Sequence, residues 1–315
     1  MSSEPTPTRE AEQQDVVQAE QAALREQATR PERAPLPERA TPSEQVTLSA
    51  QPEQPEQVTQ TERAVPSAQD DADQQDPDAL PAPPPLAVRA RGLVLTGSRG
   101  AVYGPVDLDL PAGALTVVQG PQGAGRSSLL LTLAGRMVPD RGSDLTVLGE
   151  DLPRRRAAVQ RRAAVAGFAG VDELDDSVTV GDVTRERLAW LSPWYRWTGR
   201  VSQERFAALA GPVFGERPLP RVSTVIWDLD EVDAMLLRVT LALAQEPELL
   251  VVDDVDQVHD SGRRQTVWTR LEAIAAAGTT VIASVASLDE VARMRWWTPP
   301  EVANLATGPH AVPAA

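Results

Sequence analysis

The chain has 315 residues, enough for two average domains, and carries a net charge of −15. Residues 1 to about 85 contribute −11 of this charge, because 17 acidic residues there face only six arginines, and the rest of the chain carries only −4. The chain has no cysteine, which excludes disulfides and thiol chemistry.

The first segment, residues 1–85, is rich in Glu, Gln, Pro, Ala, Ser and Thr and contains no glycine or aromatic residue. A segment of this composition cannot bury enough apolar surface to offset the entropy lost on folding. We therefore expect a long disordered N-terminal tail, which is either a solvated spacer or a docking or phosphorylation segment.

No signal or membrane segment is recognisable in the sequence. The N-terminus lacks a charged-then-apolar leader, and no run of about 18 apolar residues occurs. We expect a soluble protein that reaches a membrane only through a partner.

The first expected elements after the tail are strands at residues 86–95 and 103–110, which flank a glycine-containing turn. A β-rich run at 115–119 leads into a glycine-rich segment at 120–128, and a helix-like run at 129–134 follows. Strand, glycine-rich loop and helix in this order are the context that a phosphate-binding loop requires.

The glycine-rich segment fits the pattern G-x-x-x-x-G-K-[ST], except that Arg126 stands in place of lysine. Backbone N–H groups of such a loop converge on phosphate oxygens, and the hydroxyl of Ser127 is a ligand that suits Mg²⁺. An ordinary strand–helix turn is the alternative. The residues expected to bind the nucleotide are Gly120, Gln122, Gly123, Ala124, Gly125, Arg126, Ser127 and Ser128.

Residues 185–215 have a helical pattern that includes Trp190, Trp194 and Trp197. Spacings of four and three place these side chains on one helix face. That face either packs against the rest of the domain or contacts a partner, since tryptophan is favoured at interface hot spots.

A further helix is expected at 233–245, followed by the apolar run 249–252, which is typical of a parallel strand covered on both faces. Another helix at 264–277 and another buried strand at 279–283 come next. Because helices alternate with strands, we predict the α/β fold class, with a parallel sheet and ligand chemistry at the carboxyl ends of its strands.

Two aspartates, Asp253 and Asp254, directly follow the strand 249–252, as in a Walker B segment. Adjacent acids at a buried strand end are costly unless a cation or hydrogen bonds offset them. We expect Asp253 to hold Mg²⁺ through water and Asp254 to be the catalytic residue that orients the attacking water. A simple strand-end turn is the structural alternative.

The segment 238–254 carries a more specific resemblance. Its run Arg-Val-Thr-Leu-Ala-Leu-Ala-Gln-Glu-Pro, its apolar strand and its two acids resemble the signature helix and Walker B strand of ATP-binding cassette (ABC) transporter ATPases. Asp260, seven residues after Asp253, is similar to the D-loop aspartate of that family, and strings at 133–136 and 147–149 also match. The resemblance spans about residues 87–290.

This resemblance implies a RecA-like phosphate-loop core over residues 86–315, with an inserted helical subdomain at about 170–245. It also implies ATP and Mg²⁺ as cofactors, and ATP-driven head-to-tail dimers coupled to a membrane-spanning transporter subunit. The expected location is therefore the cytoplasm, at the inner face of the cell membrane.

Three departures from the family pattern lie at positions of expected chemistry. Arg126 replaces a lysine, and its planar fork is not equivalent to a compact ammonium. Asp254 replaces a glutamate that is one methylene longer. The signature Leu-Ser-Gly-Gly-Gln aligns with Leu-Asp-Glu-Val-Asp at 229–233, whose carboxylates repel phosphate but can cap a helix.

Further departures concern single side chains. Ala286 stands in place of the switch histidine, and Gly97 in place of an adenine-stacking aromatic, with Tyr103 too late in the chain to replace it. No coupling glutamine lies near 170–172, and His259 is expected to be incidental. The chain after residue 291 is short, so we expect the terminal strands to be reduced or absent.

These observations predict an ATP-binding subunit of an ABC-type transporter that binds MgATP, with weak or no hydrolysis. A non-enzymatic ABC-like scaffold or regulatory protein is the alternative. The predicted partners are a membrane-spanning transporter subunit and a second, more intact ATPase subunit. Nucleic acid is not expected, because the only basic tracts, at 154–156 and 161–162, are short and the tail would repel phosphate backbones.

Overall fold

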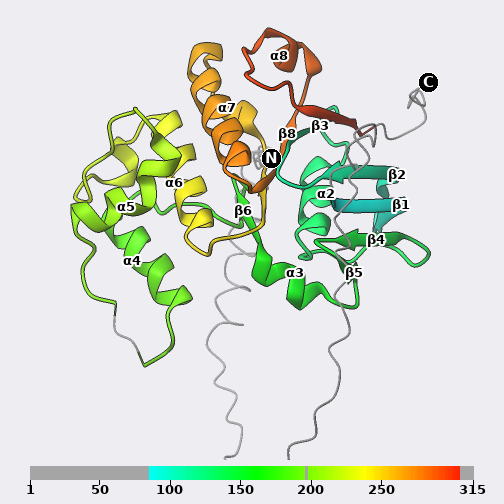
Figure 1. Cartoon of the computed structure of the whole chain (residues 1–315), viewed down its shortest axis with the longest axis horizontal. Coiled ribbons are helices and arrows are strands. Elements are labelled where there is room, and N and C mark those ends of the chain that lie inside the picture. The colour runs from blue at the N-terminus through cyan, green and yellow to red at the C-terminus, as the bar shows by residue number, and fades with distance from the viewer. Residues whose placement is uncertain (1–84, 196–197, 306–315) are drawn as a thin grey trace, which may run out of the picture. The chain divides into compact units, whose positions relative to one another are not determined.

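The computed structural model describes residues 85–195 and 198–305. The predicted N-terminal tail and Trp197 lie outside the described residues. Figure 1 shows helices α4 (Val180–Leu191), α5 (Gln203–Phe214) and α6 (Glu231–Leu243) gathered on one side of the fold. Strands β1 (Leu86–Gly97), β2 (Gly100–Pro111), β4 (Asp144–Val147) and β5 (Glu150–Leu152) lie on the other side.

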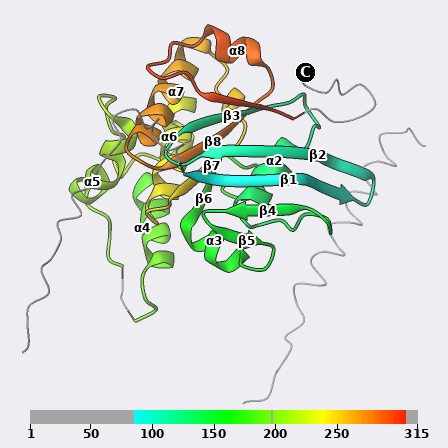
Figure 2. The same ribbon diagram turned by 45° about the vertical axis from the view of Figure 1, so that its right-hand side comes forward.

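One sheet is antiparallel and has the strand order β2-β1-β4-β5. Strands β1 (Leu86–Gly97) and β2 (Gly100–Pro111) form the predicted hairpin, and β4 (Asp144–Val147) and β5 (Glu150–Leu152) extend the sheet from β1. Figure 2 shows the long β1–β2 pair running side by side across this part of the molecule. Inward-facing residues alternate with exposed ones along β2, so the sheet buries one face.

The second sheet is parallel and has the order β6-β7-β8-β3-β9. Its central strands β7 and β8 are buried at every position, which confirms the predicted parallel α/β sheet. Within the described residues, one short strand, β9, follows β8 in the chain and lies at the edge of this sheet. The strands are β3 (Leu115–Gln119), β6 (Ala163–Ala166), β7 (Leu249–Val252), β8 (Thr280–Val285) and β9 (Glu301–Asn304).

Two hydrophobic cores cover the two faces of the parallel sheet. Leu249 and Val251 face a core shared with the antiparallel sheet and with α2 (Arg126–Leu133). Leu250 and Val252 face the other core, which contains Trp268 and the buried faces of α5, α6 and α7. Because a hydrophobic core packs on each face of the parallel sheet, the carboxyl ends of its strands are held in place from both sides. The remaining helices are α3 (Arg156–Arg162), α6 (Glu231–Leu243), α7 (Ser261–Ala276) and α8 (Leu288–Arg293), with 3₁₀ turns η1 (Ile226–Asp228) and η2 (Val255–Gln257).

The single helical segment predicted at 185–215 is wrong, because two helices, α4 (Val180–Leu191) and α5 (Gln203–Phe214), occupy this region. Helix α4 ends at Leu191, and its C-cap Ser192 has an extended backbone before Pro193, as proline favours in the residue that precedes it. Helix α5 restarts at Ser202, whose hydroxyl accepts the N–H of Arg205.

Trp190 and Trp194 do not share one helix face, and Trp197 lies outside the described residues. Trp190 lies at the end of α4 and Trp194 lies in the turn beyond it, and their exposed fractions are 79% and 96%. These two side chains therefore do not pack against the domain, and a partner contact stays a prediction. No helix within the described ranges is long and apolar enough to span a bilayer.

Candidate nucleotide-binding site

The glycine-rich loop joins the carboxyl end of β3 to the first residue of α2. Gly125 has a left-handed backbone (φ 82°), and a Cβ there would run into the carbonyl oxygen of Val102 in β2. Gly123 is also left-handed (φ 83°), but a Cβ there would point into open space. Only glycine therefore fits at position 125, whereas a side chain at position 123 would extend into open space.

The other predicted loop residues have distinct environments. A Cβ on Gly120 would meet the carbonyl oxygen of Leu305 at 3.0 Å, so the loop start is packed closely on the segment that follows β9. Ala124 is buried and donates its N–H to the carbonyl of Pro121 at 3.0 Å. By contrast, Gln122 and Ser127 are exposed, and Ser128 is half-buried at the start of α2.

Arg126 provides the test of whether this loop suits a phosphate. Its side chain is 13% exposed, and its NH1 nitrogen is buried with no hydrogen-bond partner among the described residues. The nearest carboxylate oxygen, Oδ2 of Asp256, lies 3.9 Å away, beyond hydrogen-bond distance. A buried cationic donor without an acceptor, beside glycines at a helix N-terminus, fits an anionic ligand.

Asp253 and Asp254 lie at the end of β7, where Ser284 of β8 fixes both. The Ser284 hydroxyl donates to Oδ1 of Asp253 at 2.5 Å and accepts the N–H of Asp254 at 2.9 Å. Asp253 is buried, and Ser284 is fully enclosed. This shared hydroxyl orients the carboxylate predicted to hold Mg²⁺, and oxygen is the ligand type that Mg²⁺ prefers.

Asp254 has an unusual backbone and a crowded carboxyl group. It is one of the few non-glycine residues with a left-handed conformation (φ 49°) among those described. Burial raises the pKa of Asp254, the charges of Asp256 and Asp253 raise it further, and Arg126 opposes the shift. The predicted catalytic carboxylate therefore sits among like charges.

The signature-aligned segment at 229–233 begins α6, and its acids are paired within the chain. Asp230 caps the helix by accepting the N–H of Asp233 at 2.8 Å, which confirms the capping interpretation. Arg217 donates to both Asp230 and Asp233 at 2.5 Å, and its pKa is raised, most strongly by the hydrogen bond to Asp233. One arginine thus offsets two of the three carboxylates.

The third carboxylate of this segment, Glu231, contacts His259. The backbone N–H of His259 donates to Oε2 of Glu231 at 3.0 Å, and its ring Nδ1 lies 2.9 Å from Oε1. These contacts lower the pKa of Glu231, with the backbone hydrogen bond as the largest cause. The histidine expected to be incidental therefore joins the signature-aligned segment to the turn before α7.

Two further sequence predictions concern missing side chains. Tyr103 is fully buried and donates its hydroxyl to Thr132 at 2.7 Å, so it does not replace the adenine-stacking aromatic. At the expected coupling position, the carboxylate of Asp172 accepts the N–H groups of Gly167 and Phe168. Burial raises the pKa of Asp172, although these hydrogen bonds oppose the shift.

Sequence reasoning missed three residues that shape this region: Asp256, Ser284 and Arg217. Asp256 could have been noticed as a third acid after β7, and Ser284 as the hydroxyl in an otherwise apolar strand. No local signal marks Arg217, because it lies 13 and 16 residues before its two carboxylate partners.

A glycine-rich loop between a parallel strand and a helix, with acids at the end of a neighbouring strand, defines a phosphate-loop nucleotide-binding domain. The family model described as ABC transporter matches residues 103–257. Residues 103–257 therefore form a domain of the ABC transporter family.

The chain is also similar to curated proteins that are named as ATP-binding proteins. The chain is 30% identical over 193 residues to Nod factor export ATP-binding protein I of Cupriavidus pinatubonensis, which covers 61% of this chain and 56% of that protein. It is 29% identical over 209 residues to the daunorubicin/doxorubicin resistance ATP-binding protein DrrA of Streptomyces peucetius, covering 66% and 60%. The chain thus spans somewhat more than half the length of these relatives.

Solved structures share the fold at lower identity. The cbiO1 structure from Clostridium perfringens, part of an ABC transporter complex, has a TM-score of 0.56 at 14% identity, covering 70% of this chain and 84% of that one. A nucleotide-free ATP-binding cassette from an ABC transporter has a TM-score of 0.54 at 16% identity, covering 70% and 87%. The predicted phosphate-loop core with a parallel sheet is confirmed as the ABC ATPase fold.

Proposed function

We propose that this chain is the ATP-binding subunit of an ABC-type transporter and binds MgATP at the loop 120–128, with weak or no hydrolysis. The observation that carries the proposal is the buried, unsatisfied NH1 donor of Arg126 beside a glycine cradle at the N-terminus of α2. Such a loop offers N–H groups and one positive charge to the phosphates.

Each site residue has a proposed part in binding. The backbone of Gly120, Gly123 and Gly125 admits the phosphates closely, and Arg126 donates to their oxygens. Gln122, Ala124 and Ser128 contribute backbone or side-chain donors along the same cradle. Ser127 and Asp253 would hold Mg²⁺, which neutralises phosphate charge when it is bound.

Weak hydrolysis follows from the environment of Asp254. Its side chain is short, its backbone is held left-handed, and burial and two neighbouring acids raise its pKa. A carboxylate misplaced by about 1 Å can lose ~10²-fold in rate. In addition, the signature-aligned acids are engaged by Arg217 and His259 and offer no cation to a phosphate.

We propose a membrane-spanning transporter subunit as the main partner and a second, more intact ATPase subunit as the other half of an ATP sandwich. The relatives named for Nod factor export and drug resistance support an outward direction of transport. The chain would then act at the cytoplasmic face of the cell membrane. A non-catalytic scaffold is the second candidate, favoured by the exposed side chains of Trp190 and Trp194.

A calorimetric titration of the full chain with MgATP tests the proposal through a matched pair of variants. Gly123→Asp adds a carboxylate on the open side of the loop, where a phosphate would lie. Gly149→Asp places the same residue at a similar backbone angle (φ 78°), also in open space, but in the turn between β4 and β5. Both variants therefore bear a similar backbone strain.

We expect the wild-type chain and Gly149→Asp to bind MgATP equally and Gly123→Asp to bind at least about fivefold more weakly. The reason is charge repulsion of ~1–4 kcal/mol at about 4 Å. If wild type and both variants bind equally, the nucleotide lies elsewhere and the site assignment is wrong. If the wild type does not bind, only the scaffold function remains.

A further inference from the structure

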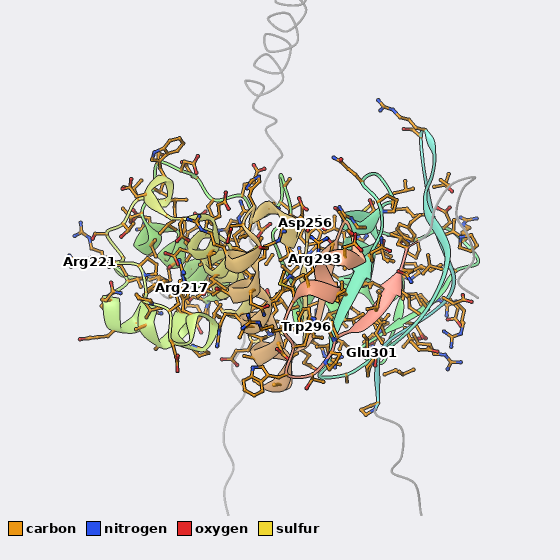
Figure 3. All side chains as sticks on the ribbon, turned by 90° about the horizontal axis from the view of Figure 1, so that it is seen from above. Arg217, Arg221, Asp256, Arg293, Trp296 and Glu301 are labelled. Atoms are coloured by element: carbon orange, nitrogen blue, oxygen red, sulfur yellow. The ribbon has the colours of Figure 1, made fainter. Side chains whose placement is uncertain are left out.

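The carboxylate of Asp256 lies on the β7–β8 side of the phosphate loop. Asp256 belongs to η2, directly after the two strand-end acids, and Figure 3 shows it near the centre of the molecule, away from Arg217 and Arg221. Its Oδ2 atom is 3.9 Å from NH1 of Arg126 and accepts the N–H of Ala286 at 2.7 Å. Three segments far apart in sequence thus meet at this one oxygen.

A backbone N–H group fixes the position of the Asp256 carboxylate. Ala286 follows β8, and its N–H donates to the Asp256 carboxylate. At 3.9 Å from Oδ2 of Asp256, NH1 of Arg126 is attracted by the negative charge but makes no hydrogen bond to it. The side chains of Arg126 and Asp256 are 13% and 23% exposed, so water screens their interaction only in part. The NH1 donor stays available for an oxygen that approaches from the loop.

We propose that Asp256 is a specificity-determining residue that makes the loop favour a nucleoside diphosphate over a triphosphate. The inference rests on the proposed nucleotide site. The loop N–H groups enclose the inner phosphates, and the arginine at this position reaches toward the last two. A third phosphate extends from the loop toward the ends of the neighbouring strands, where the Asp256 carboxylate already lies.

The charge balance around Arg126 supports this discrimination. Asp253, Asp254 and Asp256 all follow β7, so three acidic side chains lie within four residues of its carboxyl end. A triphosphate carries about one more negative charge than a diphosphate and brings it nearest to Asp256. Repulsion between like charges at about 4 Å near a surface corresponds to an affinity loss of roughly tenfold or more.

The test is a calorimetric titration of the full chain with MgATP and, separately, with MgADP. Asp256→Asn removes the charge but keeps an oxygen that can accept the Ala286 N–H. Asp228→Asn is the matched control, because Asp228 is an exposed acid in the other 3₁₀ turn, η1, and its substitution changes the net charge equally. Thermal melting of each variant shows that it is folded, and Asp256→Ser is the second variant if Asp256→Asn is not.

We expect wild type and Asp228→Asn to bind MgADP at least as tightly as MgATP. Asp256→Asn should bind MgATP about tenfold more tightly than wild type, with less than threefold change for MgADP. An ATP-to-ADP affinity ratio that stays within twofold of wild type in the Asp256 variants would overturn this inference while leaving the nucleotide site intact. Failure of both nucleotides to bind to any of the proteins would overturn the proposed function as well.

Discussion

The phosphate loop and the signature-aligned start of α6 differ in whether their polar groups are engaged within the chain. In the loop, the glycines set the backbone path, and the NH1 donor of Arg126 has no hydrogen-bond partner among the described residues. At the start of α6, Arg217 and His259 engage all three carboxylates within the chain. The phosphate loop can therefore still bind an anion, whereas the polar side chains at the start of α6 already bind one another within the chain.

The difference shows that a helix N-terminus does not by itself make a phosphate site. Helices α2 and α6 both present N-terminal N–H groups, but the Asp230 carboxylate occupies one of those at the start of α6. No side chain caps α2, whose N-cap is Gly125. An uncapped helix start can accept a phosphate, whereas a start capped by its own acids repels one.

The largest expected effect is on the loop side, where Gly125→Ala should destabilise the fold by about 2–5 kcal/mol. An alanine at position 125 would have to adopt a left-handed backbone, and its Cβ would run into the Val102 carbonyl. Gly100→Ala is the control, because Gly100 also has a positive φ but open space around its Cα. Urea denaturation of both variants measures the difference. Equal losses would mean that the loop is not packed against β2.

A smaller effect is expected on the signature side from Arg217→Met, which should cost roughly 1–3 kcal/mol. The substitution leaves Asp230 and Asp233 without their shared cation, in a partly buried site. Arg221→Met is the matched control, since Arg221 is exposed and lies on the same side of the molecule as Arg217, as Figure 3 shows. Similar melting temperatures for the two variants would contradict the internal pairing of the signature acids.

On the loop side, Tyr103→Phe removes the hydrogen bond that the Tyr103 hydroxyl donates to Thr132 of α2. We expect a loss of about 1 kcal/mol at neutral pH. Burial raises the pKa of Tyr103 to about 12, so between pH 10 and 12 the unfolded chain ionises its phenol while the folded chain does not. Wild-type stability should therefore fall by roughly 2–3 kcal/mol as pH rises through this range.

Alkaline denaturation measured by ultraviolet absorbance checks this prediction. The chain has only two tyrosines, and Tyr195 is exposed. In wild type, the phenol of Tyr103 should ionise only with unfolding. The Phe variant should lose this step and be the more stable protein near pH 12. Two phenols that both titrate before unfolding would show that Tyr103 is accessible.

The smallest expected effect comes from His259→Gln, on the signature side. The pair of His259 with Glu231 is largely exposed, and exposed pairs contribute little to stability. The backbone N–H of His259 can still donate to Glu231 in the variant. We expect no measurable change in melting temperature between pH 5 and 8. A clear loss would show that the imidazole itself fixes the start of α6.

Much of the fold could be predicted because the order of apolar and polar residues along the chain indicates most of its strands. The hairpin β1–β2, the loop after β3 and the buried strands β7 and β8 follow from alternating or continuous apolar runs. The tryptophan spacing predicts a continuous helical segment at 185–215, but Pro193 interrupts it and two helices result. A local stop signal overrides a periodic pattern.

The candidate site could be predicted only where its residues are contiguous. The loop residues and the acids after β7 form two short strings, and strand order brings them to one sheet edge. The contact of Asp256 with Ala286 and the pairing of Arg217 with Asp233 join segments separated by 30 and 16 residues. Such contacts arise from tertiary packing, and no spacing in the sequence encodes them.

The most direct test of the contrast between these two regions is light scattering of the full chain with saturating MgATP, with bound nucleotide measured in the same fraction. We predict that the nucleotide travels with the protein while the molar mass stays that of the nucleotide-free sample, because the phosphate loop binds and the acidic start of α6 cannot complete a second copy's site. An ATP-dependent doubling of the mass would contradict the account.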